Sequence, residues 1–261
     1  MLIVITGKGG VGKTMVSALL VKAITKLKEN KDIEGEILAV DADPASNFAS
    51  ALGIKAMGSV GDIREDMRKK MDNGTFPQMD KEMYFDGKVF EITAECCIRN
   101  INFEFIEMGR PEGYECYCAL NDMLKKILKK MENAYKFIVV DCEAGLEHIS
   151  RRTTTKADIM FIVTDTSNAG FRTVGKIRDM AERFGVKKEG IFLVLNKFNE
   201  NLDNENLKEK IKISKIPEIC RIPYEEEIAE FNLTGKPLTE ISEDSKAYIA
   251  ILEITRKIGH L

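Results

Sequence analysis

A glycine-rich segment near the start of the chain has the residue types and spacing of a phosphate-binding loop. Residues 7–14 read GKGGVGKT, which matches the pattern G-x-x-x-x-G-K-[ST], and they follow an apolar run, Leu2 to Ile5. In such a loop backbone N–H groups surround a phosphate chain, while the lysine reaches the β- and γ-phosphates and the hydroxyl binds Mg²⁺. Those roles fall to Lys13 and Thr14. The predicted phosphate and Mg²⁺ ligands are Gly9, Gly10, Val11, Gly12, Lys13 and Thr14.

Carboxylates follow two further apolar runs. Asp41 and Asp43 come after Ile37–Val40, and Asp141 ends the most apolar run, Phe137–Val140. Ligands of an open parallel sheet bind beyond the carboxyl ends of its strands, so these acids are expected to face the phosphates. Asp141 would hold Mg²⁺ or one of its waters. For Asp43 the alternative is an ordinary helix N-cap.

Asn196 and Lys197 bear on which base the site would bind, and they close a later apolar run. The guanine motif N-K-x-D would need a carboxylate at position 199, where this chain has Asn199. One carboxylate can accept from both N1–H and the exocyclic amine of guanine, whereas a side-chain amide has a single acceptor oxygen. Adenine is therefore favoured, with Asn196 at its N6/N7 edge. An ordinary turn residue is the alternative for Asn196.

A pair of cysteines, Cys116 and Cys118, follows a turn-rich segment and precedes a helical pattern. Amides at a helix N-terminus favour the thiolate form, which binds soft metals. One C-x-C pair supplies two ligands, and a twofold dimer would supply four, which suits tetrahedral Zn²⁺ or square-planar Ni²⁺. Buried structural thiols are the alternative. The remaining cysteines are expected to be buried thiols: Cys96, Cys97, Cys142 and Cys220.

The elements that must position these residues alternate along the chain. Expected strands are Leu2–Ile5, Ile37–Val40, Val89–Thr93, Phe103–Met108, Phe137–Val140, Ile159–Val163, Ile191–Leu195 and Ile219–Ile222. Expected helices are Lys13–Lys28, Asp62–Met71, Ala119–Asn133, Phe171–Phe184, Asn206–Ile213 and Asp244–Ile258. Continuous apolar strands between helices predict an α/β fold of doubly wound type, with a mainly parallel sheet covered by helices on both faces. We expect residues 1–261 to form a single domain.

The composition of the chain excludes some classes of function. The 261 residues carry 31% charged side chains and a net charge of −3, which gives no general attraction to nucleic acid or to acidic membranes. No apolar run is long enough to span a membrane, and the N-terminus does not resemble a signal peptide. We therefore expect a cytoplasmic protein that binds neither nucleic acid nor membrane.

The form GKGGVGKT resembles the deviant Walker A loop of the plasmid-partition, septum-site and nitrogenase iron-protein ATPases. The resemblance implies that Lys8 crosses a homodimer interface to the partner's phosphates. Residues 43–47 are similar to the first switch of these ATPases, and residues 141–145 to the second. By resemblance, Lys8, Lys13 and Asp43 form the catalytic set, with Asp43 orienting the attacking water. Pro223 and Tyr224 resemble the backbone contact to adenine.

Residues 109–118, which read GRPEGYECYC, are similar to a segment of the carbon monoxide dehydrogenase maturation ATPases. This resemblance implies an ATP- and Mg²⁺-dependent metallochaperone that forms a homodimer. Its cargo would be Ni²⁺, or Zn²⁺ at the same cysteines, and its client the carbon monoxide dehydrogenase apoprotein. Two alternatives stay open. The four sulfurs would also hold an iron–sulfur cluster for electron transfer, and a basic amphipathic C-terminal helix would suit a membrane-associated positioning ATPase.

Overall fold

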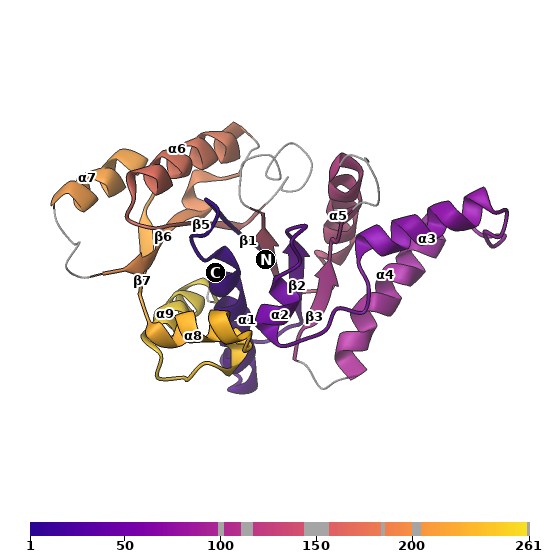
Figure 1. The fold of residues 1–261 in the computed structure, drawn as a ribbon, viewed down its shortest axis with the longest axis horizontal. Helices are drawn as coiled ribbons and strands as arrows, with labels where there is room; N and C mark the ends of the chain where they lie inside the picture. The colour runs from indigo at the N-terminus through magenta and orange to yellow at the C-terminus, as the bar shows by residue number, and fades with distance from the viewer. Residues whose placement is uncertain (99–101, 111–116, 144–156, 184–185, 200–204, 260–261) are drawn as a thin grey trace.

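The centre of the molecule is a parallel sheet of seven strands in the order β3-β2-β4-β1-β5-β6-β7 (Figure 1). The computed structural model describes residues 1–98, 102–110, 117–143, 157–183, 186–199 and 205–259. The strands are β1 (Leu2–Gly7), β2 (Ile37–Ala42), β3 (Glu104–Glu107), β4 (Phe137–Cys142), β5 (Ile159–Thr164), β6 (Ile191–Phe198) and β7 (Glu218–Pro223). Their hydrogen-bonded neighbours all run parallel.

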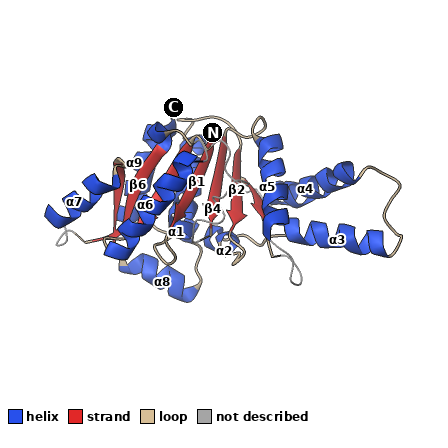
Figure 2. Cartoon of the chain, turned by 90° about the horizontal axis from the view of Figure 1, so that it is seen from above, coloured by secondary structure: helices blue, strands red, loops and turns tan. Residues whose placement is uncertain are grey.

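Helices cover both faces of this sheet (Figure 2). They are α1 (Lys13–Glu29), α2 (Phe48–Leu52), α3 (Val60–Asp72), α4 (Lys81–Ile98), α5 (Tyr117–Met131), α6 (Asn168–Arg183), α7 (Glu205–Ser214), α8 (Glu226–Thr234) and α9 (Lys246–Gly259). Short 3₁₀ helices span Lys188–Gly190 and Leu238–Glu240. The fold class predicted from the sequence is confirmed. That the chain forms one domain stays a prediction.

Alternate residues of β1 enter different apolar cores. Ile3 and Ile5 pack with α1, α8 and α9, whereas Leu2 and Val4 pack on the other face with α5 and α6. This two-sided burial explains why the strands read as continuous apolar runs rather than as alternating ones.

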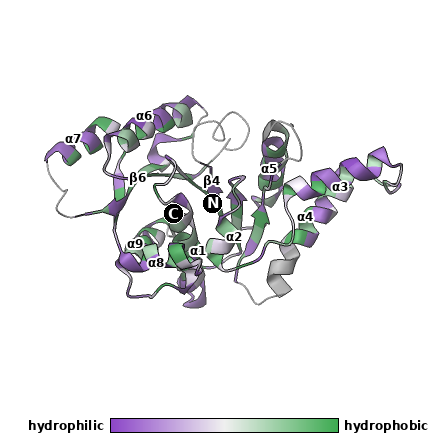
Figure 3. Ribbon diagram, viewed as in Figure 1, coloured by the Kyte–Doolittle hydropathy of each residue, from purple (hydrophilic) through white to green (hydrophobic). Residues whose placement is uncertain are grey.

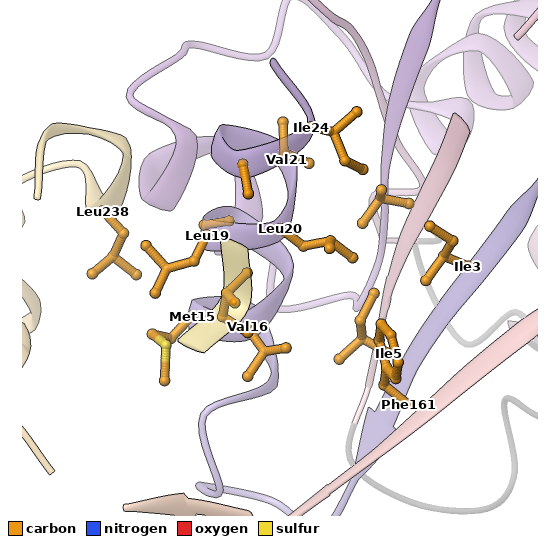
Figure 4. Packing of buried hydrophobic residues seen from close by; sticks show 14 of the residues in the cluster. Ile3, Ile5, Met15, Val16, Leu19, Leu20, Val21, Ile24, Phe161 and Leu238 are labelled. Atoms are coloured by element: carbon orange, nitrogen blue, oxygen red, sulfur yellow. The ribbon is translucent and has the colours of Figure 1, made fainter. Parts of the chain in front are cut away.

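Helix α1 is buried along most of its length because α9 and the segment at Leu238 cover the side that faces away from the sheet. Met15, Leu19 and Leu20 are almost fully buried, and Figure 4 shows them packed between Leu238 and the strands. A helix enclosed in this way holds its N-terminus rigidly, and that end follows directly on the phosphate-binding loop.

One predicted strand, Val89–Thr93, is wrong, because these residues belong to α4. Phe85, Val89 and Thr93 are buried at a spacing of four residues, whereas Phe90 is 71% exposed. A short apolar run does not distinguish a strand from one face of a helix, and here the helical period decides. Cys96 and Cys97 accordingly lie in a helix rather than near the end of a strand.

Helices α3 and α4 form an arm that projects from the body (Figure 1). Ser59 and Asp62 form a reciprocal capping box that begins α3, and residues 73–80 separate the two helices. Much of the outer part of α3 is hydrophilic (Figure 3). None of the helices in the described ranges is both long and apolar enough to cross a membrane.

Candidate nucleotide site

The loop between β1 and α1 has the backbone that a phosphate cradle requires. Gly10 and Gly12 adopt φ values of 77° and 93°, which favour glycine. A Cβ atom added to Gly12 would lie 2.3 Å from Nδ2 of Asn196, so space as well as conformation demands glycine there. Helix α1 begins at Lys13, and its N–H groups and dipole favour an anion at this end.

Thr14 and Asp141 meet at the base of this loop. The Thr14 hydroxyl donates to Oδ2 of Asp141 at 2.6 Å, and Ser17 donates to Oδ1 at 2.9 Å. Burial raises the pKa of Asp141 to about 6, although both hydrogen bonds act to lower it. A hydroxyl beside a carboxylate is a donor set that fits Mg²⁺. Thr14 and Asp141 are the residues that would hold the ion, and Ser17 orients the carboxylate, a contact the sequence did not indicate.

Lys13 is 7% exposed, and its Nζ lies 3.4 Å from the backbone oxygen of Lys8. The ammonium is therefore held inside the loop, where phosphates are expected. Lys8 is half-buried, and within the described ranges its ammonium forms no ion pair. The partner contact inferred for Lys8 stays a prediction.

Asp41 is the buried anchor of the segment that carries Asp43. Its Oδ1 accepts from the backbone N–H of Asp43 and its Oδ2 from that of Phe48, both at 2.9 Å. Asp43 lines the cavity and accepts from the N–H of Ala45 at 2.8 Å. The N-cap alternative for Asp43 is wrong, because α2 begins after Asn47. The position of Asp41 at a strand end follows from the sequence, but this structural role does not.

The pKa of Asp41 is raised to about 7, first by burial and then by the nearby charges of Asp141 and Glu107, against the two backbone hydrogen bonds. Asp41 and Asp141 are register partners on β2 and β4, so the two acids share the carboxyl edge of the sheet. Without a bound cation, the pKa values of both carboxyl groups at this edge are raised. A cation bound beside them would stabilise their charged forms, so the edge is a favourable place for a cation.

This shift predicts an unusual pH dependence of stability without nucleotide or Mg²⁺. The folded pKa of about 7 lies above that of an exposed aspartate, near 4. Between these values the folded protein retains a proton that the unfolded chain has lost, so stability falls as pH rises. We expect Asp41 to lower the free energy of unfolding by roughly 2–4 kcal/mol between about pH 4.5 and 7.5.

Urea unfolding of wild type and Asp41→Asn across this range checks the prediction. The variant should lose the part of the pH slope that Asp41 causes, because its amide does not titrate, and it should keep the part at lower pH that comes from Asp141, whose pKa is raised to about 6. Asp244→Asn, at an exposed position, is the control and should keep the wild-type slope. An unchanged slope in Asp41→Asn would assign the pH dependence to other groups.

A cavity of about 570 Å³ extends from the loop toward the end of β7. Its far wall comprises Pro223, Tyr224 and one face of α8, including Ile228 and Asn232. Pro223 and Tyr224, the predicted backbone contact to adenine, therefore lie at one end and the predicted phosphate ligands at the other. This is the arrangement that a nucleoside triphosphate requires.

Asn196 lines this cavity beside the phosphate loop and is 2% exposed. Its Nδ2 donates to the backbone oxygen of Val11 at 2.7 Å, and Nζ of Lys197 donates to that of Gly10 at 2.9 Å. Asn196 therefore holds the phosphate loop as well as lining the cavity. Its contact with adenine stays a prediction, as do those of Pro223 and Tyr224.

The predicted metal cysteines are only partly described. Cys116 lies outside the described residues, as does Gly145 of the second switch, and Cys118 belongs to the first turn of α5. Among the described residues, no cluster of three or more histidine, cysteine or acidic side chains is arranged to bind a metal. Cys142 and Cys220 are buried, as predicted, and burial raises both pKa values, that of Cys220 to about 12.

A parallel sheet with this loop after β1, and with the Thr14–Asp141 pair at the carboxyl edge, defines a P-loop nucleotide hydrolase. More narrowly, the chain belongs to the CobQ/CobB/MinD/ParA nucleotide binding domain family, whose model matches residues 2–238. It is thus a nucleotide-binding ATPase.

The similarity to known proteins extends along nearly the whole chain. An uncharacterized ATP-binding protein of Methanocaldococcus jannaschii is 40% identical, covering 99% of this chain and 98% of the relative. The carbon monoxide dehydrogenase accessory protein CooC of Rhodospirillum rubrum is 24% identical, covering 99% and 98%. Among solved structures, the MinD cell division protein of Aquifex aeolicus superposes with a TM-score of 0.69 at 22% identity, covering 99% and 96%.

Proposed function

We propose that this ATPase is a metallochaperone: a homodimer closed by ATP and metal that assists nickel insertion into the carbon monoxide dehydrogenase apoprotein. The observation that carries the proposal is the C-x-C pair formed by Cys116 and Cys118, of which Cys118 lies in the first turn of α5. Thiolates are favoured at a helix N-terminus. The similarity to a carbon monoxide dehydrogenase accessory protein supports that apoprotein as the client.

The topology supports a link between this pair and the nucleotide. The segment that carries the cysteines leaves the carboxyl end of β3, and the phosphate loop leaves that of β1. In a parallel sheet these ends share one edge. A twofold dimer that brings two such edges together would therefore bring together both the nucleotides and the dithiols. Helix α5 is firmly anchored, because Leu120 and Leu124 are fully buried.

Hydrolysis would use the residues already placed. Lys13 would stabilise the charge that develops on the transferred phosphoryl group, and Lys8 of the partner would add a second positive charge across the interface. Asp43 would orient the attacking water. A carboxylate beside a triphosphate contributes more by positioning the water than by removing its proton. Mg²⁺ at Thr14 and Asp141 would supply charge neutralisation. Loss of the γ-phosphate would release the Asp43 segment and reopen the dimer.

The test is the solution mass and metal content of the full chain, with and without a non-hydrolysable ATP analogue. We expect a dimer with one Ni²⁺ per two chains when the analogue and Ni²⁺ are both present. Tight Ni²⁺ binding by a monomer, or no binding, would contradict the bridging site. A brown, iron-containing dimer after anaerobic purification would favour the electron-transfer alternative.

A second candidate, a positioning ATPase that binds membrane, is favoured by the likeness of the fold to MinD. Against it, the apolar face of α9 is already in use: Tyr248, Ile251 and Ile254 are buried against the rest of the protein. A helix that binds a bilayer needs that face free. ATP-dependent pelleting of the full chain with anionic liposomes would support this candidate, and its absence would remove it.

A further inference from the structure

Arg110 connects the loop that carries Asp43 to the start of the cysteine segment. Its Nε donates to the backbone oxygen of Pro44 at 2.7 Å, although the two residues are 66 positions apart. Pro44 directly follows Asp43, which lines the nucleotide cavity, and Arg110 lies six positions before Cys116. This side chain therefore bridges two segments that the proposed function requires to communicate.

The backbone at Arg110 is fixed against the start of α3. Gly109 has a φ of 70°, and a Cβ atom there would lie 2.2 Å from Oγ of Ser59. A Cβ atom on Gly61 would likewise lie 2.6 Å from the backbone oxygen of Arg110. The N–H of Gly61 donates to the oxygen of Met108 at 3.0 Å. These close contacts mean that residue 110 and the base of the arm must move together.

The other end of the bridge is tied to the nucleotide side. The N–H of Met108 donates to the backbone oxygen of Asp41 at 2.8 Å, while the carboxylate of Asp41 holds both ends of the Asp43 segment. A displacement of Asp43 and Pro44 toward a γ-phosphate would also move the Pro44 carbonyl, which accepts the hydrogen bond from Arg110. The guanidinium of Arg110 would follow such a displacement, because its planar group holds its donors in a fixed geometry.

We propose that Arg110 is a positioning residue that couples the nucleotide state of the Asp43 loop to the cysteine segment and to the base of the α3–α4 arm. The part that concerns the cysteines rests on the proposed function, because it takes Cys116 and Cys118 as the cargo site. Arg110 acts through the carbonyl of Pro44 and is not among the residues that line the nucleotide cavity. Coupling between sites of this kind commonly changes affinity by about 5- to 100-fold.

The test compares wild type, Arg110→Ala, Arg110→Lys and the control Arg256→Ala, which changes an exposed arginine on α9. Hydrogen exchange of residues 59–63 and 105–110 is followed with and without a non-hydrolysable ATP analogue. In wild type and the control, the analogue should slow this exchange. In Arg110→Ala most of the slowing should be lost, while nucleotide affinity stays within about threefold. Arg110→Lys should restore part of it because the lysine ammonium still donates hydrogen bonds.

Ni²⁺ affinity with the ATP analogue and with ADP is measured on the same four proteins. The ratio of the two affinities should fall about fivefold or more in Arg110→Ala. If the ATP analogue slowed hydrogen exchange fully in Arg110→Ala, or not at all in wild type, the proposed coupling through Arg110 would be refuted. Slowing that depends on Arg110 in a protein that binds no Ni²⁺ would uphold the coupling to the arm and refute the proposed cargo. An unchanged unfolding temperature in Arg110→Ala shows that the loss is not one of folding.

Discussion

Replacing Lys13 by alanine should lower kcat for ATP hydrolysis by about 100- to 1000-fold, the usual cost of removing one preorganised charge or donor from a reacting group. The ammonium is held inside the phosphate loop, with 7% of the residue exposed, at the N-terminus of a buried helix. Because Lys13 is largely buried, solvent would replace this charge poorly. Phosphate release under saturating ATP and Mg²⁺ measures the effect.

Lys28→Ala is the matched control on the same helix. Lys28 forms a surface ion pair with Glu36 at 3.0 Å, and such pairs contribute little. We expect wild-type hydrolysis from this variant. If Lys13→Ala kept more than about a tenth of the wild-type kcat, the phosphate role of Lys13 would be refuted.

Mixing variants separates the two loop lysines. If Lys8 acts on the partner's nucleotide and Lys13 on its own, Lys8→Ala and Lys13→Ala are each inactive alone. A mixed dimer then has one site with both lysines, because the Lys13→Ala chain donates an intact Lys8 to its partner. Random pairing of equal amounts makes half the dimers mixed, so about a quarter of wild-type activity should return. No recovery would place Lys8 on its own subunit's nucleotide.

Much of the fold follows from the sequence because a parallel sheet buries both faces of its strands. The run Phe137–Val140 predicts the core of β4, and Leu2–Ile5 that of β1. The same reasoning fails at Val89–Thr93, where a short run fits either period and only the neighbouring helices decide. Short helix α2 carries no periodic signal of its own.

In the candidate site, too, some features follow from the sequence and others do not. Thr14 and Asp141 could be paired from the sequence, since a loop after one strand and an acid after another must meet at one edge of the sheet. The burial of Asp41 and the bond from Asn196 to Val11 depend on tertiary packing, which local patterns do not encode. Nor does the sequence indicate that Arg110 reaches Pro44, because a contact over 66 residues requires the folded chain.

The second large effect concerns the cysteines. Replacing both Cys116 and Cys118 by alanine removes all four sulfurs from the proposed dimer site and should weaken Ni²⁺ binding by at least about 100-fold, given the free energies typical of thiolate sites. Cys116→Ala alone removes two of the four. Equilibrium dialysis with Ni²⁺, in the presence of the ATP analogue, measures affinity and stoichiometry together.

Cys220→Ala provides a control that shares the chemistry of the change but not the site. Burial raises the pKa of the Cys220 thiol to about 12, so at neutral pH it is protonated and a poor metal ligand. This variant should still bind one Ni²⁺ per dimer with wild-type affinity. If Cys116→Ala likewise kept one tightly bound Ni²⁺ per dimer, the bridging dithiol would be refuted, and ATP would have to serve some function other than closing a metal site.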